Sequence, residues 1–345
     1  MGNDIIDPAG LTPGQARALR AYAIQTKEQL AELQGFPLPD DRQGADLGDL
    51  LVDQSLVPAN PVPVPVSHRR LGIRAAPDGS SPVVSDRIGH ARNHQRLVDH
   101  VDGLGELPLS ASLAHRFPAT GDQMQEDACV GFAASDVAGF LRGVAMSPWA
   151  AYQLARDEEG MPLQTGSYQY YAYRGYFKHG PVEARHYGYQ DWLDRKPLTP
   201  LLRHAMGHRI GGFVDLIGHA HDLGYFERMA KAVLTGQMKP GEPPAPVPVS
   251  VALFTSHAMP SVEKTGMFRL PLPGEDRVGG HAMVLVGYRD ADAPDNPFGV
   301  GYFIARNSWG SWACDNPFGL SGHALIPYDY LADYARLWEA YWVLA

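Results

Sequence analysis

A cysteine, a histidine, an asparagine and a glutamine, far apart in the chain, have the side chains needed for thiol-dependent acyl transfer. Cys129 is a nucleophile only as a thiolate, which forms near neutral pH when a neighbouring base takes its proton. His281 can be that base, and Asn307 can hold one ring nitrogen so that the other faces the sulfur. Gln123 lies six residues before the cysteine, so its side-chain NH2 can bind a developing oxyanion together with the backbone N–H of Cys129.

The segments that follow these residues predict rigid elements that can hold them. Cys129 precedes a mostly small and apolar run, residues 130–141, which predicts a buried helix whose positive N-terminal end favours the thiolate. His281 opens the apolar run 282–286, which predicts a central strand, and Asn307 follows a second strand-like run. We therefore expect the cysteine on one wall of a cleft and the histidine on the other.

Several short motifs occur in an order that is specific in combination, although each motif alone is weak evidence. They are residues 107–113, 123–133, 147–148, 279–288, 302–310 and 322–331. With these motifs the chain resembles the papain-like (C1-type) cysteine peptidases, most closely their bacterial branch, over roughly residues 105–345.

The resemblance implies a cysteine endopeptidase that cleaves peptide bonds through a thioester, and it implies a role for each residue. Cys129 would be the nucleophile, His281 the general acid and base, and Asn307 the group that orients the imidazole. Gln123 would stabilise the oxyanion, and Trp309 would shield the histidine–asparagine hydrogen bond from water. A peptide or protein substrate would lie in the groove between two lobes.

The resemblance also implies an α+β, two-lobed fold: a helical lobe plus an antiparallel β-barrel lobe, preceded by a small helical N-terminal region. The expected helices are 130–141, 148–159 and 231–234, and the expected strands are 247–254, 282–288, 301–305 and 323–326. The tyrosine-rich residues 168–173 are interpreted as a packed surface segment.

Two residues before the nucleophile depart from the family pattern. The family usually has Gly-Ser or Gly-Thr there, whereas this chain has Asp127 and Ala128, preceded by Glu126. Two carboxylates near Cys129 oppose thiolate formation, because like charges disfavour one another. Two alternatives to the endopeptidase therefore stay open: a peptide ligase or transpeptidase on the same fold, and a catalytically silent papain-like binding protein.

The chain divides at prolines. The expected parts are a helical N-terminal region at 1–56, a proline-rich linker at 57–104 and the peptidase domain at 105–345. Thr12 and Thr26 each begin a sequence typical of a capped helix, which predicts a small helical hairpin. The N-terminal region could be an inhibitory pro-region, a partner-docking module or support for the fold. The pair Arg69-Arg70 is a candidate processing site if the protein is a zymogen.

Composition excludes several other function classes. The formal net charge is −9, which argues against nucleic-acid binding through a broad basic surface. We expect no membrane span, because no apolar stretch approaches the required length of about 18 residues. The N-terminus lacks a signal-peptide pattern and the chain has 2 cysteines, which together suit a reducing cytoplasm, with leaderless export as the alternative.

No cofactor or metal is expected. His204 and His208 are four residues apart, and His219 and His221 are two apart, spacings that could hold a metal ion. No pattern of flanking carboxylates accompanies them, so we interpret these histidines as ordinary structural residues.

Overall fold

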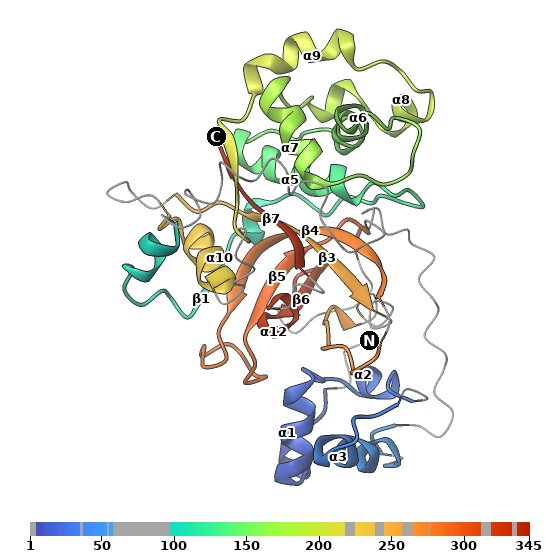
Figure 1. Ribbon diagram of the computed structural model, residues 1–345, viewed down its shortest axis with the longest axis vertical. Coiled ribbons are helices and arrows are strands. Elements are labelled where there is room, and N and C mark those ends of the chain that lie inside the picture. The colour runs from blue at the N-terminus through green and yellow to red at the C-terminus, as the bar shows by residue number, and fades with distance from the viewer. Residues whose placement is uncertain are drawn as a thin grey trace.

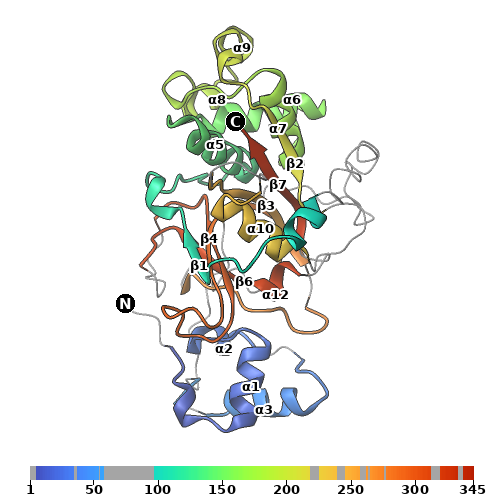
Figure 2. The ribbon, with the colours of Figure 1, turned by 90° about the vertical axis from the view of Figure 1, so that its left-hand side faces the viewer.

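Three parts of the molecule follow one another along its long axis: a helical lobe, a β-sheet lobe and a group of N-terminal helices (Figure 1). This computed structural model describes residues 5–34, 37–53, 55–57, 97–217, 225–238, 245–256, 262, 265–275, 277–311, 319–332 and 337–345. The sheet lobe lies between the other two parts, and a view turned by 90° shows the same order (Figure 2).

The helical lobe consists mainly of five helices. They are α5 (Cys129–Arg142), α6 (Pro148–Glu159), α7 (Gln169–Lys178), α8 (Tyr189–Leu193) and α9 (Thr199–Ala205). Gly131 allows α5 to pack closely on α6, because a Cβ at that position would lie 2.3 Å from the carbonyl oxygen of Pro148. The helices expected at 130–141 and 148–159 are confirmed as α5 and α6.

The tyrosine-rich segment corrects one expectation. It forms the first half of α7 rather than a surface segment, and Tyr173 and Tyr176 point into the core. Aromatic side chains repeat too closely along the segment to show one apolar stripe, which hides the helical period in the sequence.

The sheet lobe contains seven antiparallel strands in the order β2-β7-β3-β4-β5-β6, with β1 paired to β4, among the described residues. They are β1 (Ser110–Ser112), β2 (Gly212–Asp215), β3 (Val249–Ser256), β4 (Arg277–Arg289), β5 (Tyr302–Arg306), β6 (His323–Pro327) and β7 (Leu337–Leu344). Helices α10 (Phe226–Thr235) and α12 (Tyr328–Leu331) pack beside them. The sheet is buried at most positions of β5, β6 and β7, which explains the continuous apolar runs in the sequence.

Each expected strand is present, but β4 is longer than the apolar run suggested. It begins at Arg277 and includes Gly279 and Gly280, so His281 lies within the strand, opposite Leu253 of β3, and does not open it. The helix expected at 231–234 is likewise the last part of the longer α10.

The described residues of the N-terminal region form three α-helices rather than a hairpin of two. Capping boxes at Thr12 and Thr26 begin α1 (Pro13–Ala21) and α2 (Lys27–Ala31), as the sequence predicted. The sequence reading missed α3 (Arg42–Leu51), which the side chain of Asp41 caps. These helices have a core of their own, which Leu272 of the sheet lobe completes.

Residues 97–102 form a helical segment that belongs to the main core. Val98 and Val101 are buried in it, and the guanidinium of Arg228 donates to the carbonyl oxygens of Val101 at 3.0 Å and Leu104 at 2.6 Å. The contacts of the chain with the main core thus begin before residue 105. Most of the expected linker, and Arg69-Arg70 within it, lie outside the described residues.

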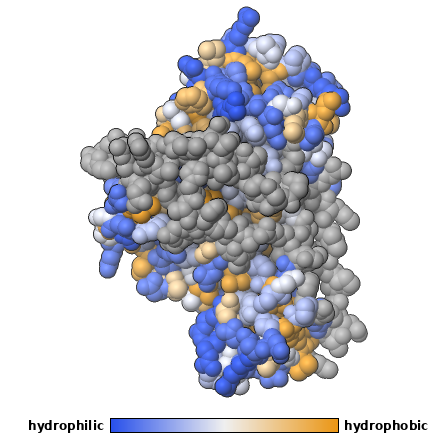
Figure 3. Space-filling view, in the orientation of Figure 1, coloured by the Kyte–Doolittle hydropathy of each residue, from blue (hydrophilic) through white to orange (hydrophobic). Residues whose placement is uncertain are grey.

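The outer surface is mixed in character. On the face shown in Figure 3, the helical lobe and the N-terminal helices are largely hydrophilic, with scattered apolar atoms. The most exposed large apolar side chains, Leu163 and Val52, belong to these two separate parts. No helix in the described part of the chain is long and apolar enough to cross a membrane.

Candidate active site

Cys129 is the first residue of α5, at the boundary between the helical lobe and the sheet. Its side chain is fully buried, and no side chain caps the helix at Ala128. The positive end of the helix dipole therefore acts on the sulfur without a capping oxygen to offset it, which favours the thiolate.

His281 reaches the site from β4, and Asn307 follows the last residue of β5. The imidazole Nε2 donates to the side-chain oxygen of Asn307 at 2.7 Å, and the backbone N–H of Ser308 donates to the same oxygen at 2.7 Å. Two donors on one oxygen fix the orientation of the amide. The other ring nitrogen, Nδ1, is buried and makes no hydrogen bond within the described part of the chain.

Burial lowers the pKa of His281 to about 4, and the hydrogen bond with Asn307 partly opposes that fall. The imidazole is therefore neutral at rest, with its proton on Nε2 and a lone pair on Nδ1. This is the tautomer that can accept a proton from a thiol.

Trp309 covers the histidine. The centroids of the two rings lie 4.8 Å apart at an interplanar angle of 34°, and the tryptophan is 2% exposed. An indole in this position keeps water away from the imidazole and from its bond to Asn307, because it replaces the solvent on that face of the ring.

Hydrogen bonds of its side chain and of its backbone hold Gln123 in the same cluster. Its side-chain oxygen accepts from the hydroxyl of Ser308 at 2.6 Å, its backbone N–H donates to the carbonyl of Ser308 at 2.8 Å, and its side-chain NH2 donates to the carbonyl of Glu126 at 2.6 Å. An amide NH2 group can donate two hydrogen bonds, and one of them goes to the carbonyl of Glu126.

The two acidic residues before the nucleophile are half-buried. Glu126 accepts a hydrogen bond from the hydroxyl of Tyr189 at 3.2 Å. Asp127 and Cys129 lie close enough to Tyr152 to add to the effect of burial, which raises the pKa of that phenol to about 12. The acidic character expected beside the sulfur is therefore present, and one carboxylate is engaged by a tyrosine.

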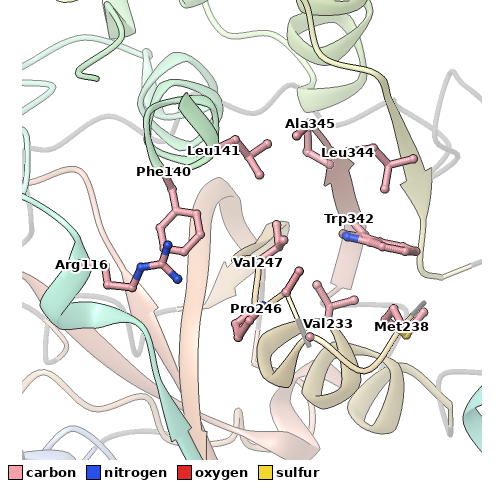
Figure 4. Close-up of a pocket in the computed structure, with 13 residues that line it drawn as sticks. Arg116, Phe140, Leu141, Val233, Met238, Pro246, Val247, Trp342, Leu344 and Ala345 are labelled. Carbon is pink, nitrogen blue, oxygen red and sulfur yellow. The ribbon is translucent and has the colours of Figure 1, made fainter. Parts of the chain in front are cut away.

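Two cavities lie away from these residues. One, of about 400 Å³, is lined by Phe140 and Leu141 near the end of α5 and by Trp342 of β7 (Figure 4). The other, of about 280 Å³, is lined by His204 and His208, among others. Within the described ranges no group of three or more His, Cys, Asp or Glu could hold a metal, and His219 and His221 lie outside those ranges.

The structure groups His281, Asn307 and Trp309 with Gln123, and Cys129 begins the helix α5, which contacts the strand of His281. Gln123, Cys129 and His281 are each 0% exposed, and Asn307 is 2% exposed. Sequence reasoning missed the ion pair of Arg306 with Asp136, in which the arginine is buried and the carboxylate is partly exposed. The sequence does contain a signal for this pair, because Arg306 is a charged residue at the end of an apolar strand.

Comparisons with known proteins identify the fold. No family model matches the chain. An uncharacterized peptidase C1-like protein of Acanthamoeba polyphaga mimivirus is 31% identical over 118 residues, which span 34% of this chain and 31% of that protein. Xylellain, a cysteine protease from Xylella fastidiosa, superposes with a TM-score of 0.54 at 18% identity, over 72% of this chain and 88% of xylellain. The chain has a papain-like fold.

A digestive procathepsin L 3 from the larval midgut of Tenebrio molitor is also similar, with a TM-score of 0.47 at 16% identity, over 73% of this chain and 79% of that structure. The papain-like fold and the local match to the viral protein together support kinship with the papain-like cysteine peptidases. The matched segment is only about a third of the viral protein's length.

Proposed function

We propose that this papain-like protein is a cysteine endopeptidase with Cys129 as its nucleophile. The observation that carries the proposal is the state of His281. Its Nε2 is bound to Asn307 beneath Trp309, and burial keeps the ring neutral, so that Nδ1 is a base. Cys129 at the N-terminus of α5 is the matching acid.

In the proposed reaction Cys129 transfers its proton to Nδ1 of His281, and the thiolate attacks the carbonyl carbon of a peptide bond. The side-chain NH2 of Gln123 and the backbone N–H of Cys129 hold the resulting oxyanion. The imidazolium then returns the proton to the leaving amine, which leaves a thioester. His281 next deprotonates a water molecule that hydrolyses the thioester, while Asn307 keeps the ring in place.

The direct test is labelling of Cys129 by an epoxide-type thiol inhibitor, located by peptide mass spectrometry, together with cleavage of a peptide library. We expect both in the wild type and neither in Cys129→Ala. His281→Ala is expected to keep the thiol but to slow labelling at pH 7. Wild-type protein that neither labels nor cleaves would contradict the proposal and favour a silent binding protein.

The same residues would serve a ligase or transpeptidase, in which an amine replaces the water. Product masses from reactions with an added amine nucleophile separate these activities. Hydrolysed products alone support the endopeptidase, and amine adducts as the main product support the ligase.

We further propose that the N-terminal helices are an inhibitory pro-region. They dock on residues 267–272, the segment that leads into the strand of His281. The side-chain NH2 of Gln29 donates to the carbonyl of Met267 at 3.1 Å, and the N–H of Leu270 donates to the carbonyl of Tyr22 at 2.8 Å.

The wider expectations of a cytoplasmic protein, related to the bacterial branch, stay part of this proposal. Xylellain comes from a bacterium, which supports the second expectation. Fractionation of native cells with an antibody to the chain tests the first.

A further inference from the structure

We propose that Arg306 is a positioning residue that sets the distance between Cys129 and His281 across the boundary of the two lobes. The inference rests on the proposed peptidase function and deepens it. The thiol belongs to a helix of one lobe and the imidazole to a strand of the other, so no single element fixes their separation. Contacts between the lobes must do so.

The Arg306 side chain makes three charge-assisted hydrogen bonds in three directions. Its Nε donates to the Asp136 carboxylate at 2.7 Å. One terminal nitrogen donates to the carbonyl of Pro118 at 2.8 Å, and the other to the carbonyl of Ala119 at 2.9 Å. The Arg306 side chain is only 1% exposed, whereas that of Asp136 is 21% exposed.

Each of the three directions leads to a residue of the proposed site. Asp136 lies seven residues after Cys129 on α5, which is two helical turns, so both occupy one face about 10 Å apart. Pro118 and Ala119 belong to the loop that continues to Gln123. Arg306 itself is the last residue of β5 and the direct neighbour of Asn307.

A planar guanidinium suits this task better than another cation would. Its donors have fixed directions, so it can hold three acceptors in one plane, whereas a lysine ammonium is a point charge on a flexible stem. Burial raises the pKa of the Asp136 carboxyl, and the charge of Arg306 offsets part of that rise. The charge of Arg306 therefore favours the ionised form of Asp136.

Stability alone does not explain such a pair. A buried ion pair is often no more stabilising than apolar side chains of the same volume, because both charges lose their water. Geometry is a better explanation, since a misplacement of about 1 Å between reacting groups can slow an enzyme roughly 100-fold.

The test compares Arg306→Lys with a matched control, Arg289→Lys. Arg289 also bonds a carboxylate, Asp295 at 2.6 Å, and a backbone carbonyl, that of Tyr288 at 3.0 Å. It lies eight residues along β4 from His281, or about 26 Å. Both variants keep the positive charge and lose the planar guanidinium with its fixed donor directions.

The measurements are the second-order rate constant for epoxide labelling of Cys129, kcat and KM on a cleaved library peptide, and Tm, on full-length protein before and after limited proteolysis. We expect Arg306→Lys to label and turn over at least about 10-fold more slowly, with KM changed less than about twofold, at temperatures well below its Tm. Arg289→Lys is expected to keep wild-type labelling and kcat even if its Tm falls as far.

A second variant keeps the inference testable if Arg306→Lys does not fold. Asp136→Asn preserves shape and one acceptor oxygen but removes the charge, so we expect a smaller loss of kcat in the same direction. If a folded Arg306→Lys or Asp136→Asn variant labels and turns over at wild-type rates, the role of Arg306 is overturned and the proposed function is not. A wild type that never labels would overturn the proposed function, and this inference with it.

Discussion

At the scale of single residues, burial determines the protonation state of two histidines, one of them in the proposed site. Burial lowers the pKa of His281 to about 4 and that of His323 to about 4 as well. His323 begins β6, next to Arg306 in the pairing of β5 with β6, and its Nδ1 donates to the carbonyl of Ser321 at 2.9 Å. Both rings are neutral in the folded protein at neutral pH.

These histidines make stability depend on pH in a defined direction. An unfolded histidine titrates near 6.5, so between about pH 6.5 and 4 the unfolded chain binds more protons than the folded one. Stability is therefore complete above this window and falls as the pH falls through it. We expect His323→Gln to remove about 1–3 kcal/mol of the wild-type loss of unfolding free energy between pH 7 and 4.5.

Urea unfolding at a series of pH values measures this difference. The comparison is of slopes with pH, because the glutamine also changes the stability at pH 7. Parallel curves for wild type and variant would show that His323 does not titrate in this way.

At the scale of elements, the close packing of α5 on α6 fixes the direction of the cysteine helix. We expect Gly131→Ala to destabilise the fold by about 1–3 kcal/mol, because its Cβ would lie 2.3 Å from the backbone oxygen of Pro148 and 2.7 Å from Cβ of Tyr152. Since Gly131 is two residues from Cys129, labelling of the thiol should also slow.

Gly48→Ala is the matched control for that prediction. Gly48 also lies inside a helix, α3, but the nearest atom to its Cβ would be 3.6 Å away, which is an ordinary contact. The alanine should stabilise the protein by up to about 1 kcal/mol through lower chain entropy in the unfolded state. Thermal unfolding of both variants gives the comparison, and equal Tm values would refute the packing argument.

The elements also show what a sequence can and cannot reveal. Apolar runs predicted β3, β4, β5 and β6, because buried strands are apolar throughout, whereas β7 was not predicted although it is almost entirely buried. The start of β4 was not predicted, since Gly279 and Gly280 look like a strand break until the neighbouring β3 is known. Residue types and order predicted the four central side chains, but the contact of Arg306 with Asp136 joins residues 170 apart and exists only in the folded chain.

At the scale of the whole molecule, contacts in the folded chain indicate where the proposed peptidase domain begins. The described structure ties residues 97–105 to the main core through buried Val98 and Val101 and through the guanidinium of Arg228. The N-terminal helices, by contrast, have their own core and reach the sheet lobe mainly through the segment around Leu272. A boundary before residue 97 would therefore separate the two parts with less damage than one at residue 105.

A chain that starts at residue 97 should consequently be more stable than one that starts at residue 105. The shorter chain exposes the surface that two buried valines covered, which costs roughly 2–4 kcal/mol at about 1–2 kcal/mol for each side chain. We expect the chain from residue 105 to melt several degrees lower.

If the N-terminal helices are inhibitory, the chain from residue 97 should cleave peptides faster than the full-length protein. Adding the separate 1–57 fragment should reverse the gain. Equal activity of the two chains, with Cys129 labelled equally in both, would instead make the N-terminal helices an accessory module, because removing an inhibitor must expose the thiol.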